Sequence, residues 1–344
     1  MHGYALMILR AANRVYTHAS VDLTARELEV CSHRVLGDRL GDVAPSVIGG
    51  VPYVTFSADR LDDRDVGFLS NLSSVAALFE REGDLLRPIT SRPLDRFDDD
   101  LITIQRYVGK TNELFTKLLL NVTLFTSAFS GEMLDRKFAV LDPLCGRGTT
   151  MNQALMYGFD AAGIDVDTRD FDAYALFIRT WLKNKRLKHH AELGPVRRDR
   201  RVVARRLDIT LGATKEEYRA GTTQQLTVCN ADTTQGLELL RPGSFDVVVT
   251  DLPYGVQHGS RSQDDRLSRT PADLLSGALP VWTALLRSGG ALGIAWNTRS
   301  VRREEAVAIV AGHDLVVRDS PPYLGFRHRV DQAITRDILV ARKP

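Results

Sequence analysis

The chain has 344 residues, of which 44% are apolar and 26% charged, a balance that excludes a disordered or collagen-like protein. The formal net charge is only +2, which excludes a chain that is basic throughout, as many nucleic-acid binders are. No apolar run approaches the roughly 20 residues of a membrane helix, and the apolar start lacks a basic lead, so we expect no membrane contact, no signal peptide and a cytoplasmic protein.

The first 100 residues predict a small α+β module. Its polar end, residues 91–100, is typical of a linker, which puts a boundary near residue 100. Hydrophobic periodicity predicts strands at 4–9 and 47–56 and helices at 23–35 and 65–79.

From residue 101 to residue 344 the pattern changes to strands alternating with helices. The expected strands are 139–141, one ending at 165, 226–228, 245–251, 291–295, 315–318 and 338–341. The expected helices are 114–129, 149–157, 174–185, 274–286 and about 301–310. This alternation predicts an α/β fold with a doubly wound, mostly parallel sheet. Ligands of such sheets bind beyond the carboxyl ends of the strands, so we expect the functional residues there.

A basic insertion, residues 183–225, separates the second and third strands of this second part. Its first portion, 183–206, holds ten Lys or Arg residues against two acidic ones. Such a block is either a phosphate-binding surface or a solvated surface loop or helix. The charged segment 326–331 between the last two strands leaves a similar choice between an RNA-phosphate contact and a hairpin tip.

Acidic residues follow successive strands. Asp142 precedes Gly146 and Gly148 at the start of a helix, and the glycines allow the backbone to approach a ligand closely. The turn lacks G-x-G-x-x-G and a Gly-Lys-Ser/Thr ending, so it is not a phosphate loop. Asp165 follows the next strand about 20 residues on, a spacing typical of ribose recognition. Asp232 follows the third strand, where it suits an exocyclic amine.

The fourth strand ends in Asp251-Leu-Pro-Tyr254. With the turn Asp-Pro-Leu-Cys-Gly-Arg-Gly-Thr at 142–149 and the segment 109–115 before the first helix, this motif carries a resemblance that covers roughly 105–344. The sequence resembles S-adenosylmethionine-dependent amino-methyltransferases of the Asp/Asn-Pro-Pro-Tyr type. Within that type it is similar to the THUMP-associated, UPF0020-like RNA guanine-N2 methyltransferases, which act largely on tRNA.

The resemblance implies a Rossmann-like methyltransferase domain, S-adenosyl-L-methionine as cofactor and no metal. Asp142 and Gly146 would hold the methionine part, Asp165 the ribose and Asp232 the adenine amine. The implied cofactor-binding set is Lys110, Asn112, Asp142, Pro143, Cys145, Gly146, Gly148, Thr149, Asp165, Val166 and Asp232, with Lys110 or Asn112 near the cofactor carboxylate. The three cysteines lie far apart without a CxxC pair, which argues against a zinc site or a disulfide framework and fits a reducing compartment.

The implied catalytic set is Asp251, Leu252, Pro253 and Tyr254. An exocyclic purine amine is a poor nucleophile because its lone pair is delocalised into the ring. The Asp251 carboxylate and the Leu252 carbonyl can accept its two hydrogen bonds and free the lone pair, while Tyr254 stacks on the base. A carboxylate suits guanine, whose edge offers N1–H beside N2–H₂, better than adenine. We therefore expect guanine N2 in RNA, most of all tRNA.

The sequence departs from the family at two places. Leu252 stands where the family usually has proline, and the first 100 residues contain no recognisable THUMP motif. We expect that module to be an RNA-docking region or a degenerate THUMP-like region. The alternatives left open are adenine-N6 methylation of DNA or rRNA, a catalytically inactive cofactor-binding RNA-binding protein, and a small-molecule methyltransferase.

Overall fold

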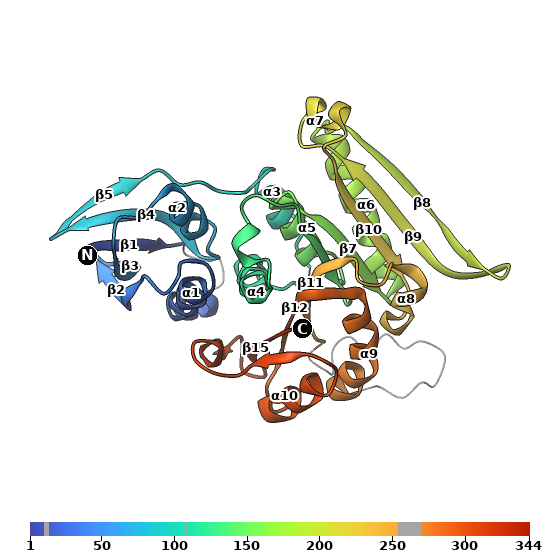
Figure 1. Cartoon of the computed structure of the whole chain (residues 1–344). Helices are drawn as coiled ribbons and strands as arrows, with labels where there is room; N and C mark the ends of the chain where they lie inside the picture. The colour runs from blue at the N-terminus through green and yellow to red at the C-terminus, as the bar shows by residue number, and fades with distance from the viewer. Residues whose placement is uncertain (10–13, 108, 254–269) are drawn as a thin grey trace.

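A computed structural model of the chain describes residues 1–9, 14–107, 109–253 and 270–344 (Figure 1). The first part forms a five-stranded antiparallel sheet of order β2-β3-β1-β4-β5. Its first six elements follow the β-α-β-β-α-β order of ferredoxin-like domains, so the expected α+β module is present. The elements are β1 (His2–Ile8), α1 (Arg14–Val35), β2 (Gly41–Ile48), β3 (Val51–Ala58), α2 (Asp63–Ser70), β4 (Val75–Glu82) and β5 (Leu85–Ile89).

Two predictions in this part were wrong. The single strand expected at 47–56 is the hairpin of β2 and β3, which turns at Gly49 and Gly50 with φ of +57° and +80°. Positive φ at both turn positions matches the twist of the flanking strands and favours glycine. The helix expected at 65–79 ends at Ser70, and the rest of that stretch forms β4, which pairs with β1 and β5. Pairing on both sides outweighs the weak helical periodicity of this short stretch.

The rest of the chain forms a ten-stranded sheet of order β13-β15-β12-β11-β6-β7-β10-β9-β8, with β14 paired to β15. Strands β10, β7, β6, β11 and β12 are parallel neighbours. The order reverses between β6 and β11, which makes that pair the topological switch point of a doubly wound sheet. The strands are β6 (Ala139–Asp142), β7 (Asp160–Asp165), β8 (His189–Arg198), β9 (Arg201–Leu211), β10 (Gln224–Asn230), β11 (Phe245–Asp251), β12 (Leu286–Asn297), β13 (Val316–Arg318), β14 (His328–Arg329) and β15 (Thr335–Arg342).

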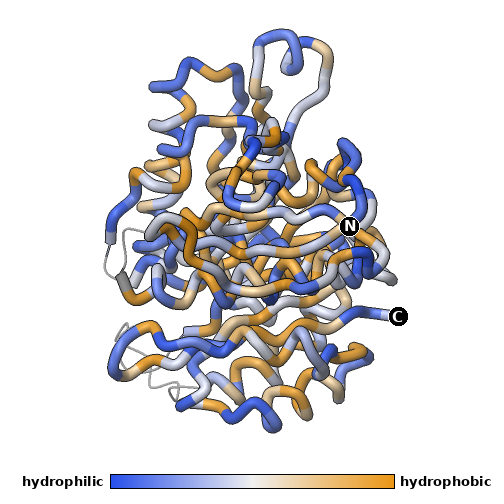
Figure 2. The backbone as a smooth tube through the Cα atoms, turned by 90° about the vertical axis from the view of Figure 1, so that its left-hand side faces the viewer, coloured by the Kyte–Doolittle hydropathy of each residue, from blue (hydrophilic) through white to orange (hydrophobic). Residues whose placement is uncertain are grey.

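Helices cover both faces of this sheet, which confirms the predicted α/β class. Neighbouring strand residues alternate between two hydrophobic clusters: Val247 and Val249 join α4, α5 and α6, whereas Val248 joins α9 and α10. Figure 2 shows the hydrophobic stretches in the interior segments and hydrophilic residues at the outer turns. The helices are α3 (Asp100–Thr103), α4 (Glu113–Thr126), α5 (Thr149–Met156), α6 (Thr168–Asn184), α7 (Lys215–Ala220), α8 (Gly236–Leu239), α9 (Pro271–Leu285) and α10 (Arg303–Ala311).

The basic insertion is neither a loop nor a helix over its most basic stretch. Residues 189–211 form the long antiparallel hairpin of β8 and β9, which extends the large sheet beyond β10 and projects from its edge (Figure 1). Part of its charge is paired, because Arg205 lies 2.8 Å from Asp172 and Arg206 lies 2.7 Å from Asp208. Its tip retains the exposed run Arg-Arg-Asp-Arg-Arg at 197–201.

The two sheets share one continuous hydrophobic cluster, in which α1 packs against α4. Inside it lies a buried set of polar residues, Glu27, Ser73, Asn121 and Tyr157, which we call the α1–α4 network. The Glu27 carboxylate accepts from the Ser73 amide at 2.9 Å, from the Ser73 hydroxyl at 2.5 Å and from Asn121 Nδ2 at 2.7 Å. Burial raises the pKa of Glu27 to about 7. None of the described helices is long and apolar enough to cross a membrane.

Candidate active site

Four acidic side chains lie at one edge of the large sheet. Asp142, Asp165 and Asp251 are the last residues of β6, β7 and β11, and Asp232 follows β10 by two residues. Because these strands are parallel neighbours, their carboxyl ends meet at the same edge. Asp142 and Asp251 flank the switch point, and the hydroxyl of Thr250 donates to Asp142 at 2.9 Å. The structure therefore brings together the strand-end residues that the sequence singled out.

The glycine-rich turn after β6 is held against β7. The Gly146 amide donates to Asp165 Oδ2 at 2.7 Å, and the Cys145 amide donates to the carbonyl of Ile164 at 3.0 Å. Both glycines have positive φ, +48° at Gly146 and +82° at Gly148. A Cβ at Gly148 would lie 2.2 Å from the ring of Tyr174, whereas a Cβ at Gly146 would meet nothing within 4 Å. The turn is thus packed on one side and leaves open space at Gly146.

The Asp142 carboxyl is buried and is surrounded by hydrogen-bond donors. Burial is the main cause that raises its pKa to about 7, and the hydroxyls of Thr150 and Thr250 and the Leu144 amide counter that effect only in part. The donors around it are neutral hydroxyl and amide groups. Such a carboxyl is suited to accept from a cationic amine, which would stabilise its ionised form.

The end of β7 combines an acidic group with an exposed apolar one. Asp165 Oδ1 accepts from the Asp167 amide at 2.8 Å, and burial raises the pKa of Asp165. Val166 is 70% exposed, although it directly follows a buried strand. The side chain of Asn230 donates to the main-chain carbonyl of Asp165 at 2.9 Å. The sequence analysis missed Asn230, although its place as the last residue of β10 is a usable signal.

Asp232 begins a short 3₁₀ helix, Thr233–Gln235. Its Oδ1 accepts from the amide of Thr234 at 2.9 Å and from the hydroxyl of Thr234 at 2.6 Å. An aspartate that caps a helix start in this way has a structural role of its own. Binding of an adenine amine by Asp232 stays a prediction.

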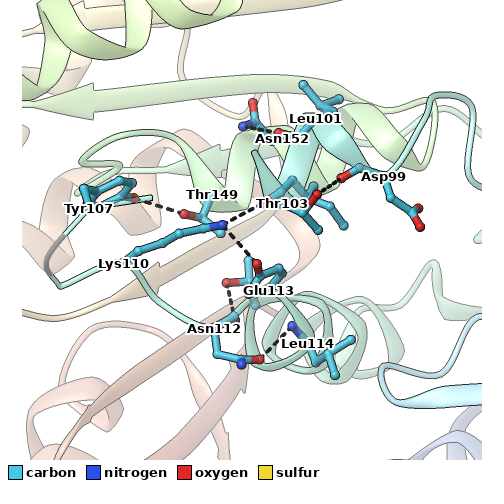
Figure 3. A network of polar contacts seen from close by, with 12 residues as sticks. Asp99, Leu101, Thr103, Tyr107, Lys110, Asn112, Glu113, Leu114, Thr149 and Asn152 are labelled. Atoms are coloured by element: carbon cyan, nitrogen blue, oxygen red, sulfur yellow. Dashed lines mark hydrogen bonds and ion pairs between the residues drawn. The ribbon is translucent and has the colours of Figure 1, made fainter. Parts of the chain in front are cut away.

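Hydrogen bonds hold the segment before α4 against α3 and the start of α5 (Figure 3). Lys110 Nζ donates to the carbonyl of Ile102 at 2.7 Å and to Glu113 Oε1 at 3.0 Å. The hydroxyl of Tyr107 lies 3.3 Å from Thr149 Oγ1, and Asn112 Oδ1 caps α4. A role of Lys110 or Asn112 at a cofactor carboxylate stays a prediction.

Two residues that the sequence analysis missed hold Asp251. The hydroxyl of Thr111 donates to Asp251 Oδ2 at 2.9 Å, and Arg336 Nη2 lies 3.2 Å from the same oxygen. The Arg336 guanidinium is itself buried and lies over the ring of Phe115, with 4.2 Å from Cζ to the ring centre. No local pattern links these residues, since they meet only in the folded chain.

The backbone of Leu252 shows why leucine can stand after Asp251, where the family usually has proline. The amide of Leu252 donates to the carbonyl of Ala295 at 2.8 Å, which continues the β11–β12 pairing by one residue. Proline has no N–H and could not make this bond. The Leu252 side chain is buried in the second hydrophobic cluster, whereas Pro253 is exposed. Tyr254 lies outside the described residues.

Two other predicted site residues of the turn are buried. Pro143 is buried, and Cys145 packs into the hydrophobic cluster, where burial raises the pKa of its thiol well above the usual value. A thiol in that state is a packing residue, not a nucleophile. Within the described ranges, no group of three or more His, Cys, Asp or Glu residues could hold a metal ion.

A doubly wound sheet with acidic residues after adjoining parallel strands, and a glycine-rich turn at the switch point, defines a Rossmann-like domain. The chain belongs to the family described as UPF0020, RMKL-like, methyltransferase domain, whose model matches residues 131–305, just over half of the chain. The match includes all four acidic strand ends. The module 1–100, the segment before α4, and strands β14 and β15 lie outside it.

A search among curated proteins found no relative of this chain. Solved structures with a similar fold include a TehB-like SAM-dependent methyltransferase from Corynebacterium glutamicum, 14% identical, with a TM-score of 0.34, covering 63% of this chain and 85% of that one. The precorrin-6y C5,15-methyltransferase from Geobacter metallireducens is 14% identical, with a TM-score of 0.35, covering 73% and 99%. The T. thermophilus 16S rRNA N2 methyltransferase, solved with AdoMet and guanosine, is 14% identical, with a TM-score of 0.38, covering 92% and 61%.

Proposed function

We propose that the protein is an S-adenosylmethionine-dependent RNA methyltransferase that modifies N2 of guanine, with tRNA as its first substrate to test. The observation that carries this proposal is the position of Asp251. Its carboxylate and the following Leu252 lie at the switch point, directly after Thr250, whose hydroxyl donates to Asp142. A methyltransferase needs the acceptor group and the cofactor to meet at one point, and this is where the two sites adjoin.

The residues present fit the cofactor. Asp142 is a buried acceptor for its amine, Gly146 leaves room for close approach, and Asp165 offers a carboxylate to the ribose hydroxyls. The exposed Val166 provides an apolar surface for the adenine ring, with Asp232 at its amine. When bound, S-adenosylmethionine supplies an electrophilic methyl group on sulfur.

Asp251 and Leu252 act on the acceptor amine. The carboxylate of Asp251 and the carbonyl of Leu252 accept its two N–H groups, which draws the nitrogen toward tetrahedral geometry and frees its lone pair. As positive charge develops on the nitrogen, the carboxylate stabilises it. Thr111 and Arg336 fix the position of this carboxylate, so little reorganisation is needed. Tyr254 would stack on the base, as expected from the motif.

The proposal also specifies guanine as the base and tRNA as the substrate. Asp251 is an acceptor only, which suits the adjacent N1–H and N2–H₂ donors of guanine and opposes the N1 acceptor of adenine. RNA docking would use the module 1–100 and the exposed arginines at the tip of the β8–β9 hairpin. The domain 101–344 would carry the chemistry.

The test is methyl transfer from tritium-labelled S-adenosylmethionine to total tRNA, rRNA and genomic DNA, followed by nucleoside analysis. We expect label in tRNA as N2-methylguanosine. Asp251→Ala should abolish the transfer while the cofactor dissociation constant stays within about twofold of wild type, because Asp251 lies on the acceptor side. Label as N6-methyladenine would overturn the base assignment. No label in any pool, with the cofactor bound, would favour an inactive binding protein.

A further inference from the structure

A pocket of about 230 Å³ lies between the segment before α4, α1 and the last strands of the large sheet. Thr111 and Arg336 line it, and both contact Asp251 Oδ2. Lys110 and Asn112, predicted near the cofactor carboxylate, also line it, so the pocket joins the predicted cofactor segment to the residues that hold Asp251. Tyr16 from α1 of the first module closes another wall, and β14 contributes His328 and Arg329. Pockets for drug-sized ligands start at roughly 300 Å³, so this one suits one part of a larger ligand.

His328, which lines this pocket, carries a buried hydrogen-bond acceptor. The residue is only 8% exposed, and its Nδ1 lies 2.9 Å from the carbonyl oxygen of Phe326. A carbonyl only accepts, so Nδ1 carries the hydrogen and Nε2 carries a lone pair. Burial lowers the pKa of His328 to about 4, which keeps the ring neutral at pH 7.

Nε2 of His328 is buried and has no hydrogen-bond partner in the part of the chain that the structure describes. Leaving a buried acceptor unmatched costs free energy, so such atoms call for an explanation. The ring packs against Phe115, at 5.3 Å between ring centres, and edge-on against Tyr16, at 6.1 Å. A ligand that donates a hydrogen bond would satisfy the atom where it stands.

The same pocket carries positive charge. Arg329 is exposed at its rim, and Arg336 and Lys110 line the interior. Arg336 is paired with Asp251 and Lys110 with Glu113. Among the described residues, the Arg329 side chain contacts the main-chain carbonyl of Asp331 and no carboxylate, so Arg329 is a cation available to a ligand. The pocket therefore fits a ligand with an anionic group and a nearby hydroxyl donor.

We propose that this pocket holds the ribose and phosphate of the acceptor nucleotide, with His328 Nε2 accepting a hydrogen bond from the 2′-hydroxyl and Arg329 at the phosphate. The inference rests on the proposed function and adds a group that selects RNA over DNA. The 2′-hydroxyl is the donor that distinguishes RNA from DNA at a given site. A deoxynucleotide would leave Nε2 unmatched, which is how a polar site rejects an analogue that lacks one hydroxyl.

The probes are guanosine and deoxyguanosine 5′-monophosphate, and adenosine and deoxyadenosine 5′-monophosphate, titrated into the full chain with S-adenosylhomocysteine present. We expect each ribonucleotide to bind about tenfold more tightly than its deoxy counterpart. His328→Phe should bring this ratio close to one with the deoxynucleotide affinity unchanged. His328→Gln, which retains an acceptor oxygen, should restore the ratio, and a purely structural role of His328 would not give that result.

Arg329→Glu should weaken ribonucleotides and deoxynucleotides by the same factor, since it removes the phosphate contact. Arg219→Glu is the matched control, because Arg219 is exposed on α7 and far from the pocket lining. Equal binding of ribo and deoxy forms by wild type, a ratio that survives His328→Phe, or no binding of any probe would overturn the proposal. The two purine pairs make failure of this proposal distinguishable from failure of the proposed function. A ribose preference without methyl transfer to guanine would support the ribose-binding pocket and refute the base assignment.

Discussion

Burial raises the pKa of two carboxyl groups of this molecule to about 7, and the two groups have opposite surroundings. Glu27, in the α1–α4 network, accepts three hydrogen bonds from Ser73 and Asn121 inside a continuous hydrophobic cluster. Asp142, at the switch point, lies at the end of a strand beside a glycine that faces open space. Burial raises both pKa values, but Asp142 begins a turn that has open space at Gly146.

The comparison shows that a raised pKa identifies burial, not function. What separates the two regions is access and the kind of partner nearby. Glu27 joins the first module to α4, so its task is to hold two parts of the chain together. Asp142 is surrounded by neutral donors and lies next to Asp165 and the open turn. A cationic amine can therefore bind to its carboxylate. Variants that alter one region should leave the measurements made on the other unchanged.

The largest effect is expected for Glu27→Ala. It removes the acceptor of Ser73 and Asn121 and leaves a cavity, so we expect a loss of about 3 kcal/mol or more in the free energy of unfolding. Urea denaturation measures this loss. The matched control is Glu29→Ala, two residues along α1, where the partly exposed carboxylate pairs with Arg26 and should contribute under about 1 kcal/mol. Cofactor affinity of folded Glu27→Ala should equal that of wild type, and a large drop there would contradict the separation of the two regions.

Next comes the pH dependence of stability. Because burial raises the folded-state pKa of Glu27 from 4.5 to about 7, the folded protein binds more protons than the unfolded chain between these values. Its contribution is therefore complete below about pH 4.5 and is lost as pH rises through about 7, a change of at most about 3 kcal/mol. Glu27→Gln should reduce the fall in unfolding free energy between about pH 5 and pH 8, and Asp142, whose pKa burial also raises to about 7, accounts for part of the fall that remains. An unchanged slope would mean that Glu27 does not titrate in this window.

At the switch point, Asp142→Asn should act on binding instead of stability. We expect the cofactor dissociation constant to rise at least about tenfold, or about 1.4 kcal/mol, because a neutral amide cannot balance a cationic amine. Glu27→Gln makes the same chemical change at the other buried carboxyl and serves as the control, with unchanged cofactor affinity. Isothermal titration of S-adenosylhomocysteine gives both values. Equal affinities in the two variants would remove Asp142 from the cofactor site.

The site residues that follow a strand directly in the chain could be predicted from the sequence. Asp142, Asp165 and Asp251 could be placed because each directly follows a buried apolar strand, and the strand order of a doubly wound sheet brings such ends together. Thr111 and Arg336 could not be found, because they meet Asp251 only through the packing of the segment before α4 and of β15. His328 lies in the charged segment 326–331, for which the sequence left open an RNA contact or a hairpin tip. The helix expected at 65–79 failed because a short apolar stretch fits both periods, and pairing of β4 with β1 decides between them.

The smallest effect, and the finest test of the comparison, comes from removing one hydroxyl in each region. Tyr157→Phe deletes the donor to Asn121 Oδ1, 2.9 Å away, and should cost about 1 kcal/mol of unfolding free energy with no change in cofactor affinity. Thr250→Val deletes the donor to Asp142 at nearly constant shape and should weaken cofactor binding a few-fold, since the carboxylate is less well oriented. Both are measured with the same denaturation and titration experiments. If Tyr157→Phe also weakened the cofactor, the α1–α4 network would be coupled to the switch point, and the first module would influence the chemistry through α4 instead of only supporting it.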